Sequence, residues 1–182
     1  MARVPYREPA ELAPEDRDLL KPPLAQFKAL ASSPKALRAF LGLGRFIRSG
    51  SRLDPRLKEL AILQVGYMAR APYEWAHHLK IGRDFGVSDS DIAGLMAETE
   101  GRPSGLDEPA CLVLRAAREI TAEGAASEAT FAALAGHLDS ERLIDLVVTI
   151  GFYNAVVRVL ATLQIDVEED YIPYLRQFPL PG

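Results

Sequence analysis

The sequence is poor in the residues that support redox chemistry, secretion and membrane insertion. It has one cysteine, Cys111, so no disulfide can form within the chain, and a cytoplasmic location is expected. The N-terminal segment MARVPYREPAELAPEDRD lacks the apolar core of a secretory signal. The most apolar stretch, residues 143–163, is interrupted by Asp145, Asn154 and Arg158. It predicts a buried or interfacial helix and no membrane partner.

An excess of positive charge is also missing. The chain has 21 Lys and Arg residues against 25 Asp and Glu, a net charge of −4, and no basic tract. This balance argues against a nucleic-acid partner, which would require a concentrated basic surface. Hydrophobic residues make up 48% and charged residues 25% of the chain, which is typical of a globular domain with a sizeable core.

Strand patterns are absent, because no alternating run of polar and apolar residues is bounded by hairpin turns. The spacing of apolar residues, together with Ser or Asp caps and prolines at helix starts, instead predicts an all-α fold. Helices are expected at residues 24–30, 34–48, 55–69, 73–85, 91–98, 108–123, 127–135 and 141–165.

Proline-rich segments flank these helices. Residues 1–24 are expected to form an extended arm with at most one short turn, near Pro14 to Leu20, and residues 167–182 a tail. The domain organisation expected from the sequence is therefore an arm at 1–24, a helical domain at 25–166 and a tail at 167–182.

Titratable residues are concentrated in the stretch from Arg52 to Asp91. Glu74 and His78 are four residues apart on one predicted helix, so their side chains share a face. At that spacing a carboxylate can orient an imidazole or share a proton transfer with it, although a solvated ion pair has the same spacing. Glu59, on the preceding helix, would approach both residues if the two helices form an antiparallel pair.

Three neighbouring residues are candidates for contacts with a substrate. His77 lies about 100 degrees around the helix from His78, so the two histidines cannot both serve one small site. An exposed or hydrogen-bonded role for His77 is a simpler explanation than a catalytic one. Tyr73 and Trp75, the only tryptophan, are core or interface residues first and candidate pocket residues second. Arg52 and Arg56 could anchor a substrate carboxylate, but ordinary capping and solvation explain them as well.

The same stretch resembles a known family. The resemblance rests on the pattern KEL-x4-V-x5-APYEWAHH-x3-G-x2-FGVSDSDIAGL and on Tyr153-Asn154 in the last long helix. These residues are similar to the carboxymuconolactone decarboxylase family, including its alkylhydroperoxidase-D-type branch, over roughly residues 34–165. The resemblance implies an orthogonal helical bundle of about six to eight helices. It also implies a homo-oligomer, as a dimer, trimer or hexamer.

The peroxidase branch of that family carries a Glu, then a Cys-x-x-Cys pair, then a His. On this sequence the Glu corresponds to Glu59 and the His to His78, whereas the two cysteine positions hold Ala71 and Glu74. Thiol peroxidase activity is therefore not expected, because it needs a nucleophilic thiolate and a resolving partner. The decarboxylase branch has a Glu-x-x-x-His pattern, which Glu74 and His78 resemble.

We therefore expect a lyase-type enzyme that acts by acid–base chemistry on a small organic acid or lactone. His78 is the expected acid/base, Glu74 orients or protonates it, and Glu59 tunes the pair, with no cofactor and no metal. Two alternatives remain: a peroxidase-type member with a degenerate redox site, and a non-catalytic oligomeric binding protein. The last alternative predicts a pocket filled by side chains.

Overall fold

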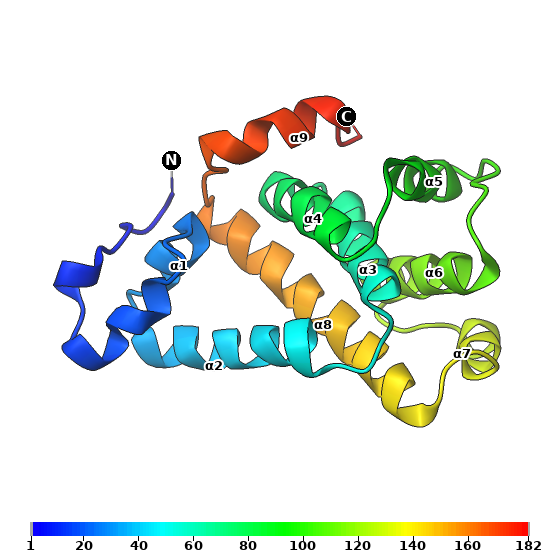
Figure 1. Cartoon of the computed structure of the whole chain (residues 1–182), viewed down its shortest axis with the longest axis horizontal. Coiled ribbons are helices and arrows are strands. Elements are labelled where there is room, and N and C mark those ends of the chain that lie inside the picture. The colour runs from blue at the N-terminus through cyan, green and yellow to red at the C-terminus, as the bar shows by residue number, and fades with distance from the viewer. Residues whose placement is uncertain (1, 182) are drawn as a thin grey trace.

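The computed structural model describes residues 2–181, and these residues form helices without a strand, which confirms the predicted all-α class (Figure 1). The α-helices are α1 Ala25–Leu30, α2 Pro34–Arg45, α3 Pro55–Met68, α4 Pro72–Asp84, α5 Asp89–Thr99, α6 Glu108–Glu123, α7 Glu128–Ala135, α8 Ser140–Leu163 and α9 Ile172–Gln177. Short 3-10 turns cover Pro9–Glu11, Pro14–Leu20 and Glu169–Tyr171, and a π-helical turn, Phe46–Gly50, extends α2.

Local capping explains why the helices begin where they do. The Asp54 carboxylate accepts a hydrogen bond from the Leu57 N–H at 3.0 Å, and Pro55 occupies the first turn of α3. Ser88 and Asp91 form a reciprocal capping box at the start of α5. Ser33 makes no side-chain cap, so α2 begins with Pro34 alone.

Helix α3 is the centre of the fold. Every residue from Leu57 to Tyr67 is buried, and the helix packs against α4, α6 and α8. The short connection at residues 69–71, with Arg70 at φ 48°, turns the chain from α3 into α4. In Figure 1, α3 and α4 lie together in the middle of the molecule, with α8 crossing beside them and α5, α6 and α7 on one side.

The N-terminal arm and the C-terminal tail both pack on the helices of their own chain. In the arm, Leu12, Leu19 and Leu20 form a small buried cluster with Ala31 and Leu37 of the α1–α2 region. The tail contains α9, which the sequence reading missed. A helix can form here because Pro173 occupies its first turn, where a proline removes no helical hydrogen bond.

Helix α8 has one face packed against α3 and α6 and one open face. By length and composition alone α8 could cross a membrane, a test that core helices of soluble proteins also pass. Its open face carries Ile144 and Val147, which are 63% and 45% exposed. The packing is therefore that of a core helix with an uncovered apolar side.

Candidate active site

Three buried side chains from α3 and α4 form a continuous chain of hydrogen bonds. Glu59 Oε2 lies 2.6 Å from His78 Nδ1, and Glu74 Oε1 lies 2.9 Å from His78 Nε2. The three residues are 3%, 4% and 5% exposed in the order Glu59, Glu74, His78. The structure thus brings together the three residues that the sequence nominates as catalytic, with the histidine between two carboxylates.

This arrangement depends on the helical pair. Glu74 and His78 share one face of α4 because they are separated by one turn. Glu59 reaches them from α3 at the level of Gly82, where an added Cβ would lie 3.6 Å from the Glu59 Cβ and 3.3 Å from a Val87 methyl carbon. A larger residue at position 82 would therefore crowd the side of α4 that Glu59 approaches.

The environment of His78 favours its charged form. Burial alone would lower the pKa of His78, but the carboxylates of Glu59 and Glu74 outweigh burial and raise this pKa to about 9. Both ring nitrogens are occupied by carboxylates, so His78 is an imidazolium near neutral pH. It can store one proton between two acceptors, but it has no free nitrogen to offer a substrate.

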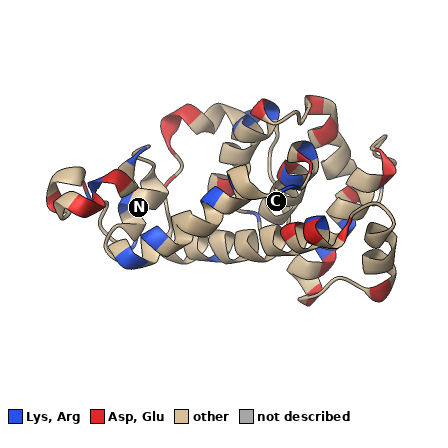
Figure 2. Ribbon diagram, turned by 60° about the horizontal axis from the view of Figure 1, so that its bottom comes forward, with Lys and Arg blue, Asp and Glu red and all other residues tan. Residues whose placement is uncertain are grey.

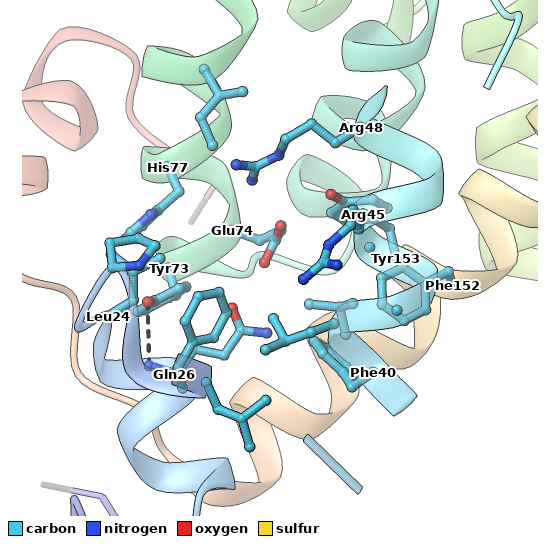
Figure 3. A pocket seen from close by; sticks show the side chains of 18 of the residues that line it. Leu24, Gln26, Phe40, Arg45, Arg48, Tyr73, Glu74, His77, Phe152 and Tyr153 are labelled. Atoms are coloured by element: carbon cyan, nitrogen blue, oxygen red, sulfur yellow. Dashed lines mark hydrogen bonds between the residues drawn. The ribbon is translucent and has the colours of Figure 1, made fainter. Parts of the chain in front are cut away.

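A pocket of about 550 Å³ opens beside this chain of residues, between α2, α4, α8 and the N-terminal arm. Glu74 and His78 line it, whereas Glu59 does not. Figure 3 shows the Glu74 carboxylate directed into the pocket, facing side chains from α2 and α8. Glu74 is consequently the end of the hydrogen-bonded chain that a bound molecule would meet.

Tyr153 of α8 is a functional candidate whose role sequence reasoning missed. It lines the pocket, and its ring meets His78 edge-on with centroids 5.1 Å apart. Burial, then the nearby carboxylates of Glu74 and Glu59, raise the pKa of Tyr153 well above its usual value. Its hydroxyl therefore stays protonated. Because it has no hydrogen-bond partner among residues 2–181, it is free to donate to a ligand.

Two of the predicted substrate-contacting residues, Tyr73 and His77, also line the pocket. The His77 ring is stacked between Tyr73 and Tyr171, with centroids 4.2 and 3.6 Å away. Glu168 accepts a hydrogen bond from the Tyr73 hydroxyl at 3.0 Å and lies 2.8 Å from His77 Nε2. These residues attach the tail to one wall of the pocket. The Tyr73 hydroxyl and His77 Nε2 are therefore already engaged in contacts within the protein.

The third predicted substrate-contacting residue, Trp75, does not line this pocket. It is fully buried, and its Nε1–H donates to the carbonyl of Phe178 in the tail at 2.8 Å. Helical periodicity explains the difference, because Trp75 lies about 100 degrees around α4 from Glu74 and so faces the core.

Arg52 and Arg56 are likewise engaged in protein contacts. Arg52 pairs with Glu141 at 2.8 Å, and Arg56 pairs with Asp91 at 2.6 Å and with Asp107 at 2.7 Å. Neither arginine lines the pocket beside Glu74, so the structure does not support either as a substrate anchor.

The lone cysteine is remote from this chemistry. Cys111 lies on α6, and its sulfur contacts Glu98 Oε2 at 3.9 Å and the Leu106 carbonyl at 3.8 Å. It does not line the pocket. Among residues 2–181, no group of three or more His, Cys, Asp or Glu side chains has the arrangement of a metal site.

Comparison with known proteins gives the same scaffold. The family model for the carboxymuconolactone decarboxylase family matches residues 34–102, the segment that holds Glu59, Glu74 and His78. An uncharacterized peroxidase-related protein from Ralstonia eutropha JMP134, with an alkylhydroperoxidase AhpD core, has a TM-score of 0.80 at 20% identity, covering 96% of this chain and 95% of its own.

Two further solved structures share the fold. An uncharacterized peroxidase-related protein from Silicibacter sp. TM1040 has a TM-score of 0.64 at 21% identity, covering 79% of this chain and 76% of its own. The debrominase Bmp8, in complex with 2,3,4-tribromopyrrole, has a TM-score of 0.76 at 18% identity, covering 97% of this chain and 99% of its own. A comparison with curated proteins found no match. At these identities the likeness establishes the fold, and the names of the neighbours point to more than one chemistry.

Proposed function

Because this chain belongs to the carboxymuconolactone decarboxylase and AhpD-like superfamily, we propose that it catalyses cofactor-independent proton transfer at a carbon atom of a small organic acid or lactone. The observation that carries this proposal is the hydrogen-bonded chain Glu59–His78–Glu74, which ends on a carboxylate facing a pocket. Such a chain can move a proton, whereas thiol chemistry has no cysteine to use there.

In this proposal Glu74 is the catalytic residue, and His78 and Glu59 act through it. This division of labour differs from the one expected from the sequence, since His78 has no free ring nitrogen. His78 holds a proton at a pKa of about 9 and gives it to the Glu74 carboxylate, and the Glu74 carboxyl group then delivers a proton to the substrate. Glu59 fixes the ring through Nδ1 and balances the positive charge.

A decarboxylation illustrates the balance of the step. The bond between the carboxylate carbon and its neighbour breaks, CO₂ leaves, and the electron pair moves into an enolate or a conjugated system. Glu74, which has taken a proton from His78, then protonates the carbanionic carbon, and a proton from solvent later restores the charged form of His78. The Tyr153 hydroxyl is suited to donate a hydrogen bond to the enolate oxygen.

The direct test is turnover of γ-carboxymuconolactone and related acids by purified protein. We expect Glu74→Gln to lower kcat by about 10²–10⁴-fold, the usual contribution of a positioned acid or base. The matched control is Glu128→Gln, which makes the same substitution at an exposed residue of α7 and should leave the rate unchanged. Equal rates in the Glu74 and Glu128 variants of an active protein would contradict the assignment.

The alternatives make different predictions for the same pocket. A non-catalytic binding protein was expected to have side chains filling this space, whereas the pocket measures about 550 Å³ and is lined by Glu74 and His78. A degenerate peroxidase would have to use Cys111, which lies outside the pocket. Hydroperoxide consumption that is lost in Cys111→Ser would nevertheless favour that alternative.

We also propose that the protein is a cytoplasmic homo-oligomer. The support is the uncovered apolar surface of Leu43 and Phe46, together with that of Ile144 and Val147 on α8, all at least 38% exposed. A second copy of the chain would cover such a surface. A monomeric mass in light scattering at micromolar concentration would contradict this proposal.

A further inference from the structure

The pocket is basic although the protein is acidic. Its lining includes the four cations Lys21, Arg38, Arg45 and Arg48, against only Asp18 and Glu74 as acidic residues. The chain as a whole carries a net charge of −4, and Figure 2 shows its Lys and Arg residues interspersed with Asp and Glu over the ribbon. An excess of positive charge in this one concave site therefore needs a local explanation.

Arg38 is the one of these four cations that forms a side-chain ion pair within residues 2–181. Arg38 pairs with Asp16 at 2.8 Å and with Asp18 at 3.4 Å. By contrast, the guanidinium groups of Arg45 and Arg48 form no hydrogen bond or ion pair within residues 2–181. In Figure 3 both guanidinium groups point from α2 and its π-helical end into the pocket, on the side that the Glu74 carboxylate faces.

Side chains of α3 and α8 hold the backbone at the end of the segment that carries these two arginines. The buried Lys58 donates through Nζ to the carbonyl of Arg48 at 3.2 Å. Asp145 of α8 then holds the turn that follows, accepting from the Ser51 hydroxyl at 2.8 Å and from the Arg52 N–H at 2.7 Å. The π-helical turn thus presents Arg48 from an anchored support, although the guanidinium itself is unpaired.

We propose that Arg45 and Arg48 form a carboxylate-binding subsite, so that the pocket takes a small organic acid as its anion. Guanidinium groups suit this role because their planar donors match the two oxygens of a carboxylate. The neighbouring rings of Phe40 and Phe152, with centroids 4.9 Å apart, provide an apolar wall for the body of the acid. The pocket combines an anion anchor, an apolar wall and the Glu74 carboxylate.

This subsite also sets the orientation of the substrate. Positive charge beside a carboxylate stabilises its negative form and so opposes its loss as neutral CO₂. The carboxylate held by Arg45 and Arg48 is therefore not the reacting group, and the reacting carbon lies toward Glu74 and Tyr153. A substrate that decarboxylates here therefore carries a second carboxyl group besides the one that the arginines hold.

The inference rests on the pocket being the substrate site of the proposed reaction, but it is tested by binding alone. The probes are adipate and hexanoate, the uncharged hexanamide, and inorganic phosphate, titrated into the full-length protein with binding followed by NMR. The variants are Arg45→Gln and Arg48→Gln, with Arg115→Gln as a control of equal charge change at an exposed residue of α6. Circular dichroism verifies that each variant is folded.

We expect the two acids to bind and hexanamide to bind at least about tenfold more weakly, because the amide lacks the charge. Each pocket variant should weaken acid binding about tenfold, and Arg115→Gln should not. Hexanamide binding as tightly as hexanoate, phosphate binding more tightly than either acid, or unchanged affinity in both pocket variants would overturn the subsite. Binding of the acids without turnover of any organic acid would support the subsite and contradict the proposed reaction. Turnover of an organic acid that does not depend on Arg45 or Arg48 would support the reaction and contradict the subsite.

Discussion

Replacing Glu59 by Gln should destabilise the protein in a way that depends on pH. Glu59 Oε2 lies 2.6 Å from His78 Nδ1 in a fully buried setting. Against the opposing effect of burial, the two carboxylates raise the pKa of His78 from its ordinary value of 6.5 to about 9, which corresponds to about 3 kcal/mol of stability. Glu59 is the larger contributor of the two, so its loss should cost about 2 kcal/mol near neutral pH.

The sign of the pH dependence follows from the raised pKa. The folded protein keeps the His78 proton up to about pH 9, whereas the unfolded chain releases it near 6.5. The stabilisation is therefore complete below pH 6.5 and is lost as the pH rises through about 9. Above that range His78 is neutral in both proteins, and an ionised Glu59 would be a buried charge without a counter-charge. The wild-type advantage should then disappear or reverse.

The assay is urea unfolding of wild type and Glu59→Gln at about pH 6, 8 and 10, at one protein concentration. Other titrating groups cancel in the difference between the two proteins. The melting temperature should fall by about 5 °C near neutral pH. Glu128→Gln, exposed on α7, serves as the control and should show no pH-dependent difference. A stability loss in Glu59→Gln that is the same at all three pH values would refute the reasoning.

Three further outcomes are expected. Cys111→Ser should leave turnover of an organic acid within about twofold of wild type, because the thiol is a packed residue outside the pocket; a larger loss would return chemistry to the thiol. Trp75→Phe should cost about 1–3 kcal/mol in urea unfolding, since it leaves the Phe178 carbonyl without its indole donor; equal stability would show that the tail is held by other contacts. Burial opposes the ionisation of Glu168, but the hydrogen bonds from His77 and the Ala25 N–H lower its pKa to about 2. The stability that the Glu168 carboxylate contributes is therefore present above about pH 4.5 and lost as the pH falls toward about 2. The stability difference between wild type and Glu168→Gln should shrink over that range, and a constant difference would contradict the lowered pKa.

Local sequence signals were sufficient to predict α1 to α8 and the pairing of Glu74 with His78. Asp54-Pro55 and the Ser88–Asp91 box act within one turn, so their effect can be inferred without knowledge of the fold. The approach of Glu59 could be proposed from the short link between α3 and α4. That His78 lies between two carboxylates, with only Glu74 at the pocket end, depends on the packing of the two helices and was not accessible.

Features that depend on contacts far apart in sequence could not be predicted. Arg45 and Arg48 share a pocket with Glu74 only because the end of α2 faces α4 across that pocket, and Tyr153 lines it from α8. Trp75 was a candidate for substrate contact because of its position in the motif, but a tail segment covers it. Arg45 and Arg48 looked like ordinary polar positions of a predicted helix until the packing of the helices was known.

The central claim, that Glu74 transfers a proton to and from carbon, is tested most directly by deuterium exchange. A small organic acid with an acidic C–H bond, incubated with the protein in D₂O, should gain deuterium at the carbon next to its carbonyl group, as followed by proton NMR. The exchange should be about 10²–10⁴-fold slower with Glu74→Gln and unchanged with Glu128→Gln. Exchange at the same rate with Glu74→Gln as with wild type would contradict the claim.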